Sequence, residues 1–370
     1  MRKLVNINLE ENIIYDNVIH EYNTPDKVYI KSSFGEINDY LYKNEFINDE
    51  IVSVSGYITN KSKNYIEVTN DFKENIKTKQ KKYKINKVDE LLKLLLKYNL
   101  NNIYEKINDK IINNIIISSV DKEVYEEREF IRLLNSYDNL LDTAEEIIKI
   151  FKVNKLTFAI KNTNSNSINN INSVIGSFPN IKILLLPDEY LIGKKEFLCE
   201  YLNINKLNTL ILTTNELYDI YRILYGIDLT KNLITISGDI EKSLIINTKL
   251  GVRLTDLIKE YNIKLPSKKE IYINGYFCGY KESSINNVLI NKSIHSIIIK
   301  EKKNIKKEEC IKCSACNKIC PYKINVYKNM LNNTSCDKCI GCNLCTFICP
   351  ANIDLKSILY KGGQKWKKRP

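Results

Sequence analysis

Two stretches near the end of the chain, CIKCSACNKICP (Cys310–Pro321) and CIGCNLCTFICP (Cys339–Pro350), repeat one pattern of cysteines. Each has the form C-x2-C-x2-C-x3-C-P, and together they hold eight of the eleven cysteines in the 370-residue chain. Three thiolates spaced in this way lie on one tight loop and can bind three irons of a cubane cluster, so the fourth iron needs a thiolate from elsewhere. The spacing therefore predicts two [4Fe–4S] clusters.

The fourth ligand of each cluster is expected to come from the other motif. In two-cluster proteins with this spacing, the remote cysteine of each motif closes the cluster of its neighbour. We therefore expect one cluster on Cys310, Cys313, Cys316 and Cys349 and the other on Cys339, Cys342, Cys345 and Cys320. A zinc site would arrange its cysteines in pairs separated by a long gap, and disulfides are rare in a reducing compartment. Neither alternative matches two quartets.

A ninth cysteine in this region, Cys336, lies three residues before Cys339. A shifted register, in which Cys336, Cys339 and Cys342 bind and Cys345 is spare, is therefore conceivable. The x3-Cys-Pro ending counts from Cys345, which favours the first register. We expect Cys336 to be a bystander thiol.

The other reactive side chains give little indication of catalysis. Cys199 lies in a helical stretch and Cys278 in NGYFCGY, and both are interpreted as core residues rather than ligands. The two histidines, His20 and His295, lie in neither a triad-like nor a metal-like setting and are expected to be structural or surface residues. Substrate-level acid–base chemistry is not expected.

The net charge of +12 is concentrated around the cysteines. The segment 306–370 has 13 Lys and Arg against 4 Asp and Glu, whereas the other 305 residues carry only +3. This balance fits a solvated basic face or an unbound basic tail, and it equally fits an acidic partner or an anionic membrane surface. Nucleic acid is not expected, because no helix-turn-helix, finger or aromatic-stacking signature accompanies the charge.

The sequence also indicates where the protein resides. The start of the chain shows no apolar signal region, and no apolar run approaches the roughly 20 residues that span a bilayer. We expect a cytoplasmic protein without a transmembrane segment.

The sequence divides into four regions that differ in their pattern of apolar and polar residues. Residues 1–82 contain alternating strand-like runs and predict a small β domain. In residues 83–228, amphipathic helices alternate with short apolar strands, so an α/β domain with an at least partly parallel sheet is expected. Residues 229–303 predict a module of strands and one helix, and residues 304–370 hold the cysteines and a basic tail. Within the second region, the helix REFIRLLNSYDNLLDTAEEIIKIF is expected to break near Asp138, and Gly226 to end NELYDIYRILYG.

The order of these regions resembles the RnfC subunit of the Rnf (Rsx) electron-transport complex and its soluble RnfC-like relatives, such as the proline-reductase-associated protein. The resemblance covers most of the chain. It is carried by the two cysteine motifs, by VSVSGYITN, and by ELYDIYRILYGIDLTKNLITISGDI followed by TKLGVRLTDLI. It implies a barrel-sandwich-like N-terminal domain, an α/β domain similar to the flavin-binding subunit of complex I, a β-grasp (SLBB-like) module and a ferredoxin-like dicluster domain.

The chain departs from this family where a flavin would bind. The family's glycine-rich FMN and NADH loop corresponds to YNLNNIYEKINDK, and no glycine occurs between Gly56 and Gly176. Such loops need glycine so that backbone amides can close on phosphate. The family's NGAECEPY appears as SSVDKEVY, for which a solvated helix start is expected at Asp121, Glu123 and Tyr125. In LPDEYLIGKKEFL, lysines stand where the family has a glycine and a glutamate. FMN is therefore an alternative cofactor rather than the expected one.

The resulting hypothesis is an electron-transfer component of an oxidoreductase complex rather than a stand-alone enzyme. It would relay electrons through both clusters between a soluble NADH- or ferredoxin-linked carrier and a partner oxidoreductase or Rnf-type membrane complex. The basic charge favours an acidic carrier of the ferredoxin or flavodoxin type. In the Rnf setting the resemblance implies a peripheral subunit at the inner face of the cell membrane. An FMN- and NADH-binding oxidoreductase subunit, and a docking or assembly subunit with structural clusters, are the alternatives.

Overall fold

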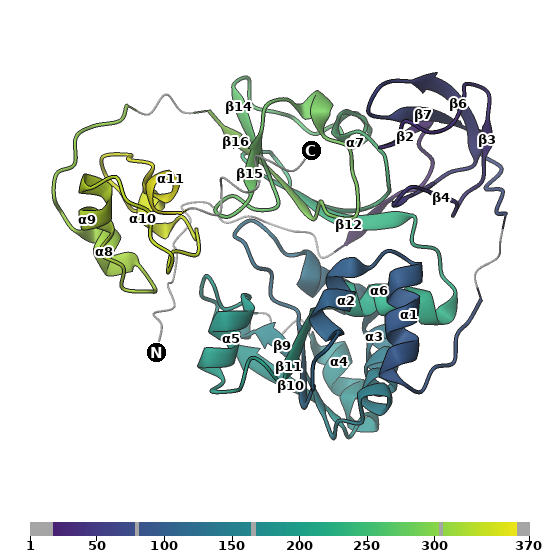
Figure 1. The fold of residues 1–370 in the computed structure, drawn as a ribbon, viewed down its shortest axis with the longest axis horizontal. Coiled ribbons are helices and arrows are strands. Elements are labelled where there is room, and N and C mark those ends of the chain that lie inside the picture. Colours follow the sequence, from purple (N-terminus) through teal and green to yellow (C-terminus); the bar gives the residue numbers. More distant parts are fainter. Residues whose placement is uncertain (1–17, 78–80, 164–167, 303–305, 361–370) are drawn as a thin grey trace.

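The computed structural model describes residues 18–77, 81–163, 168–302 and 306–360. Among these residues, strands form sheets of six, four, four and two strands, and helices join them (Figure 1). The expected mixed α/β fold with several sheets is confirmed. The cysteine-rich end forms a compact unit of short helices beside the main body (Figure 1).

A parallel sheet organises the middle of the chain. Its strands are β8 (Asn114–Ser118), β9 (Leu156–Lys161), β10 (Ile181–Leu186) and β11 (Thr209–Thr213), in the spatial order β10-β9-β8-β11. Successive side chains of β8 alternate between two cores: Ile115 and Ile117 pack into one, and Ile116 packs into the other. Strands that are buried on both faces have nearly continuous apolar sequences, which explains why these segments are so apolar.

Helices cover both faces of this sheet. The larger core contains residues of α1 (Val88–Lys97), α2 (Asn101–Ile107), α3 (Arg128–Phe151), α4 (Asn169–Val174) and α6 (Thr214–Tyr225), with the 3-10 turn η2 (Ile175–Ser177) beside them. The smaller core contains residues of α5 (Lys195–Tyr201). The break expected in α3 is confirmed as a kink at Ser136, and Gly226 ends α6 in the left-handed conformation, as expected.

The order of the strands creates a crevice. From β8 the chain adds β9 and β10 on one side, whereas β11 pairs with the opposite side of β8. In open α/β sheets, ligands bind outside the carboxyl ends of the strands at such a reversal. The segments that follow β8 and β11 meet there.

A mixed six-stranded sheet forms the second layer. Its order is β1 (Ile19–Tyr22), β13 (Leu244–Lys249), β12 (Lys231–Gly238), β16 (Ser296–Glu301), β14 (Lys269–Ile273) and β15 (Tyr280–Glu282). Helix α7 (Leu254–Glu260) packs into its core, with the 3-10 turn η3 (Ile285–Asn287) beside it. Strand β1 comes from the N-terminal region and runs parallel to β13.

A small antiparallel sheet shares the core of the second layer. It contains β2 (Lys27–Ile30), β7 (Ile66–Asn70), β6 (Gly56–Lys61) and β3 (Tyr40–Leu41), and β4 (Phe46–Ile47) pairs with β5 (Glu50–Ile51) nearby. Val28, Ile66 and Val68 of this sheet pack with residues of β12, β13, β14 and β16. The buried Lys249 pairs with Glu74 at 3.0 Å, so charge as well as apolar surface joins the two sheets.

The cysteine-rich end consists of α8 (Ala315–Ile319), α9 (Val326–Leu331), α10 (Leu344–Phe347) and α11 (Leu355–Leu359). Across the described ranges, no helix is both long enough and apolar enough to cross a membrane. The four domain ranges and their family names stay predictions.

Candidate functional site

The two cysteine motifs have the same backbone conformation at equivalent positions. Ser314 and Asn343, each directly after the second cysteine of its motif, are both left-handed, with φ of 58° and 64°. Lys323 and Asn352, beyond each Cys-Pro pair, have φ of 53° and 54°. Asn325 and Asp354 then cap α9 and α11 through their side chains. The repeated spacing therefore corresponds to a repeated structure.

The cysteines form two groups, each around its own small cavity. One cavity is lined by Cys310, Cys313, Cys316 and Cys349, and the other by Cys339, Cys342, Cys345 and Cys320. The last cysteine of each motif thus lies with the other motif. Cys336 is absent from both linings, and its N–H donates to the carbonyl of Leu359 at 2.9 Å.

This arrangement fits a cubane better than a single metal ion. Among the described residues, no group of three or more His, Cys, Asp or Glu side chains is arranged to hold one ion. In a cubane each thiolate binds a different iron, so the four sulfurs stand apart around a shared centre. The donor set, four thiols per cavity, is the one such a cluster uses. The ligand assignment stays a prediction.

The second group is the more buried one. Burial raises the pKa of Cys342 to about 11 and that of Cys345 to about 12. The charge of Lys194 opposes the shift at Cys342, and that of Lys356 opposes the raised pKa of Cys339. Two cations from elsewhere in the fold therefore lie beside this group.

A buried carboxylate connects the second cysteine loop to the rest of the protein. Glu123 follows β8, and its Oε2 accepts the backbone N–H groups of Phe277 and Cys278 at 3.1 and 3.0 Å. Its Oε1 lies 3.3 Å from the Tyr190 hydroxyl and 3.4 Å from Lys194 Nζ. Glu123 thus joins the parallel sheet, the segment before α5 and the turn between β14 and β15.

Cys278 extends this junction to the cysteine loop. Lys194 Nζ donates to Cys278 Sγ at 2.8 Å, and that thiol lies 3.6 Å from the carbonyl oxygen of Gly341. The Tyr190 hydroxyl lies 3.3 Å from the Cys342 carbonyl oxygen. Lys356 Nζ also donates to the Phe277 carbonyl at 2.6 Å. We refer to Glu123, Tyr190, Lys194, Phe277 and Cys278 as the junction.

Two expectations are corrected here, and one is confirmed. Cys278 is not a core residue but a half-buried one at the junction, whereas Cys199 is buried in the core as expected. The solvated helix start is wrong for Asp121 and Glu123, which are both buried. The reason is that each carboxylate accepts backbone N–H groups inside the fold, Asp121 from Glu129 and Glu123 from the turn after β14.

A polar cavity of about 500 Å³ lies at the crevice of the parallel sheet. It is lined by residues that follow β8, by the start of α3, by the start of α6 and by His295. Arg132 is buried there, stacked 4.1 Å over the ring of Tyr218, and its Nε donates to Asn215 at 3.2 Å. The pKa of Asp121 is raised, mainly by burial and then by the neighbouring charge of Glu129.

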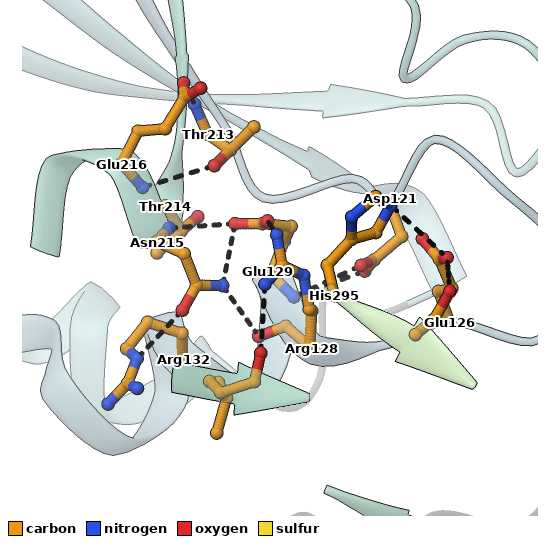
Figure 2. Close-up of polar contacts among 12 residues, drawn as sticks. Asp121, Glu126, Arg128, Glu129, Arg132, Thr213, Thr214, Asn215, Glu216 and His295 are labelled. Carbon is orange, nitrogen blue, oxygen red and sulfur yellow. Dashed lines mark hydrogen bonds and ion pairs between the residues drawn. The ribbon is translucent and has the colours of Figure 1, made fainter. Parts of the chain in front are cut away.

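The start of α6 already holds a carboxylate of the protein itself. Glu129 Oε2 accepts the backbone N–H of Asn215 at 2.8 Å and its side-chain amide at 2.9 Å (Figure 2). Thr213 Oγ1 accepts the N–H of Glu216 at 3.2 Å, while the Glu216 side chain accepts the N–H of Thr213. Helix N-termini bind phosphate through such N–H groups. Since these donors are paired and the glycine-rich loop is missing, the residues here do not fit the phosphate of a flavin nucleotide.

His295 lines the same cavity. Its Nε2 lies 3.8 Å from Glu126 Oε1 (Figure 2). Burial and the charges of Arg128 and Lys122 lower its pKa to about 3. The imidazole is therefore neutral at pH 7, and this contact is not an ion pair. His20 lies in β1 against the ring of Tyr261.

The sequence did not indicate the residues that matter most here. Glu129, Asn215, Tyr190 and Lys194 act through contacts between distant segments, and no local pattern marks such pairs. The local signals were the two stretches matched to the family: SSVDKEVY, which contains Glu123, and LPDEYLIGKKEFL, which contains Tyr190 and Lys194.

The fold and site define an α/β protein joined to a cysteine domain with two exchanged thiol groups. No protein-family profile matches the chain. A curated relative, the RnfC subunit of the ion-translocating oxidoreductase complex of Buchnera aphidicola subsp. Acyrthosiphon pisum (strain APS), is 25% identical over 229 residues. The match covers 57% of this chain and 48% of that protein, so the chain spans about half the length of the curated relative it matches. The resemblance to the RnfC family is thereby confirmed.

Solved structures of an NAD+-reducing [NiFe]-hydrogenase are also similar to part of the chain. The air-oxidised form has a TM-score of 0.46 and the H2-reduced form one of 0.42, both at 11% identity. Each match covers 58% of this chain and 46% of the hydrogenase chain.

Gly275 makes room for Glu123 and is therefore a sensitive position. Its φ is +110°, and a Cβ there would lie 2.2 Å from Glu123 Cγ. We expect Gly275→Ala to lower the free energy of unfolding by about 2 kcal/mol or more, because the strained backbone and the buried carboxylate cannot both be kept. Chemical denaturation under anaerobic conditions measures the change. Gly176→Ala, where no atom lies within 4 Å of the added Cβ, is the control and should change stability little. Equal effects of the two substitutions would contradict this account of the junction.

Glu126 should make stability fall with rising pH. Burial raises the pKa of Glu126 from the ordinary value of 4.5 to about 7. The hydrogen bond that Glu126 accepts from the Ser296 hydroxyl opposes this shift, and the charge of Glu123 adds to it. Between pH 4.5 and 7 the folded protein therefore binds this proton more tightly than the unfolded chain, so the free energy of unfolding falls as the pH rises. Glu126→Gln keeps the site neutral. As the pH rises from 4.5 to 7, the free energy of unfolding of this variant should therefore increase relative to that of the wild type, by roughly 3 kcal/mol at most. A difference that stays flat from pH 4.5 to 8 would refute this.

Proposed function

We propose that the chain is an electron-transfer subunit that holds two [4Fe–4S] clusters and relays electrons between a soluble carrier and a partner oxidoreductase complex. The observation that carries the proposal is the exchange of the remote cysteines, which brings Cys349 to the first motif and Cys320 to the second. Each cluster would supply a centre that takes up or gives one electron.

The protein's own residues prepare the second site for a negatively charged group. Leu344 and Leu359 are buried, line the cavity of the second cysteine group and keep water away. Lys194 and Lys356 reach the same loop from outside it and offset negative charge. A cluster with four thiolates is an anion, and nearby cations and exclusion of water both affect its potential.

The comparison with the curated relative supports a place in an oxidoreductase complex rather than the presence of the two clusters. The curated relative is named as a subunit of an ion-translocating oxidoreductase complex. By analogy, we propose that this chain works within a multi-subunit complex, as a peripheral component at the cytoplasmic face of the membrane. The carrier would be of the ferredoxin or flavodoxin type. FMN remains the less favoured cofactor, because Glu129 occupies the helix end that its phosphate would need.

A structural role for the second cluster is the competing hypothesis, and one observation favours it. Cys342 is only 9% exposed and its loop is held by the junction, so a cluster there could serve mainly to fix the cysteine domain in place. Replacement of Cys342 and Cys313 by Ala separates the two roles. Normal assembly with lost electron flux indicates a relay, whereas failed assembly with unchanged flux per assembled complex indicates a scaffold.

Cofactor content tests the proposal directly. Anaerobically reconstituted protein should bind about eight irons and about eight acid-labile sulfides per chain, with no flavin absorbance. Cys320→Ser and Cys349→Ser should each disturb one cluster, and electron paramagnetic resonance should show a different cluster lost in each. Cys336→Ser is the matched control and should keep both signals. Fewer than about eight irons with no reducible signal, or a signal unaffected by either substitution, would contradict the assignment.

A further inference from the structure

We propose that the two cysteine loops have different roles: the first is the docking surface for an acidic one-electron carrier protein, and the second faces the interior. This inference rests on the proposed function and adds which cluster exchanges electrons with a mobile partner. The step moves one electron between carrier and cluster. One partner is oxidised, the other is reduced, and no atom is transferred.

The two loops differ in exposure. In the first loop, Cys313 is exposed and the neighbouring Ile311 is 64% exposed. The equivalent cysteine in the second loop, Cys342, is buried, and the carbonyl groups of Gly341 and Cys342 face the junction. A protein carrier can therefore approach the first group of thiols directly, whereas the α/β domain covers the second.

One pair of equivalent residues shows why the loops diverge. Gly341 and Lys312 occupy the same left-handed position, with φ of 68° and 59°. At Gly341, a Cβ would lie 2.9 Å from the ring of Tyr360, so the close packing of that ring requires glycine. At Lys312 the side chain is exposed to solvent, where nothing packs so closely. The second loop is built for contact within the protein, and the first is built for exposure.

The loops also differ in charge. The first motif contains Lys312 and Lys318, and the second contains no charged residue. Both lysines are exposed, and within the described part of the chain neither has a carboxylate within ion-pair distance. Exposed lysines at the rim of a redox centre attract an acidic surface and speed its encounter. Redox encounters between proteins are transient and bury less than about 1,200 Å² in total, so a small exposed face is sufficient.

Rapid-mixing kinetics with a defined carrier test this surface. The probe is a purified acidic flavodoxin, fully reduced, mixed anaerobically with the oxidised cluster-loaded chain while cluster absorbance is followed. We expect Lys312→Glu/Lys318→Glu to lower the second-order rate constant about tenfold or more at low ionic strength and to remove its decrease with added salt. Lys312→Gln/Lys318→Gln removes the positive charges without adding negative ones and should give an intermediate rate. Such a graded response to charge would show that the slower reaction does not come from a folding defect.

The control variant carries the same change in charge elsewhere. Lys63→Glu/Lys93→Glu alters two exposed lysines, one in the turn between β6 and β7 and one on α1, and this variant should react with flavodoxin like the wild type. Basic cytochrome c, used as an acceptor from the reduced chain, should respond in the opposite direction and react faster with the first variant.

Iron and sulfide content, measured before each mixing, separates a failure of the docking surface from a failure of the proposed function. Full clusters in all variants with equal flavodoxin rates would overturn the docking surface and leave the relay intact. Missing clusters in the wild type would overturn the proposed function and this inference with it.

Discussion

The carboxylate of Glu123 is the constraint on which the arrangement of the whole molecule depends. It is buried after the first strand of the parallel sheet, yet it pairs with backbone N–H groups of the turn between β14 and β15. That turn, with Tyr190 and Lys194, holds the loop that contains Cys342. A buried carboxylate is stable only when its hydrogen-bond partners are in place, so a shift that breaks these contacts while the site stays buried carries a large desolvation cost. One side chain thereby fixes the distance between the crevice of the sheet and the second group of thiols.

The parts of the fold that the sequence predicted are those set by local periodicity. The apolar runs of β9 to β11 and the helical spacing of α3 and α6 lie where expected, because burial on two faces or on one stripe leaves a pattern in neighbouring residues. The exchange of Cys320 and Cys349 was predicted from spacing alone. The burial of Asp121 and Glu123 could not be predicted, since their partners lie in other elements. A carboxylate in a polar stretch looks the same in sequence whether it faces water or a buried amide.

Glu129 shows how a side chain of the protein can occupy the anion-binding end of a helix. The sheet reversal, the start of α6 and the cavity are all present, and the carboxylate occupies the N–H groups that would otherwise bind an anion. The helix end is satisfied without an external ligand. The stretch YNLNNIYEKINDK likewise lacks the glycines that let backbone amides close on a phosphate.

Strand β1 has a consequence for how the protein is made. Its residues pair with β13, so that Ile19 lies beside Ile245. At translation rates of about 5–20 residues per second, the ribosome needs roughly ten to forty seconds to synthesise the segment between them. During that time β1 lacks its partner strand, and its edge is open to other polypeptides. We therefore expect chaperones to bind this strand during biosynthesis and to keep it from pairing with other polypeptides.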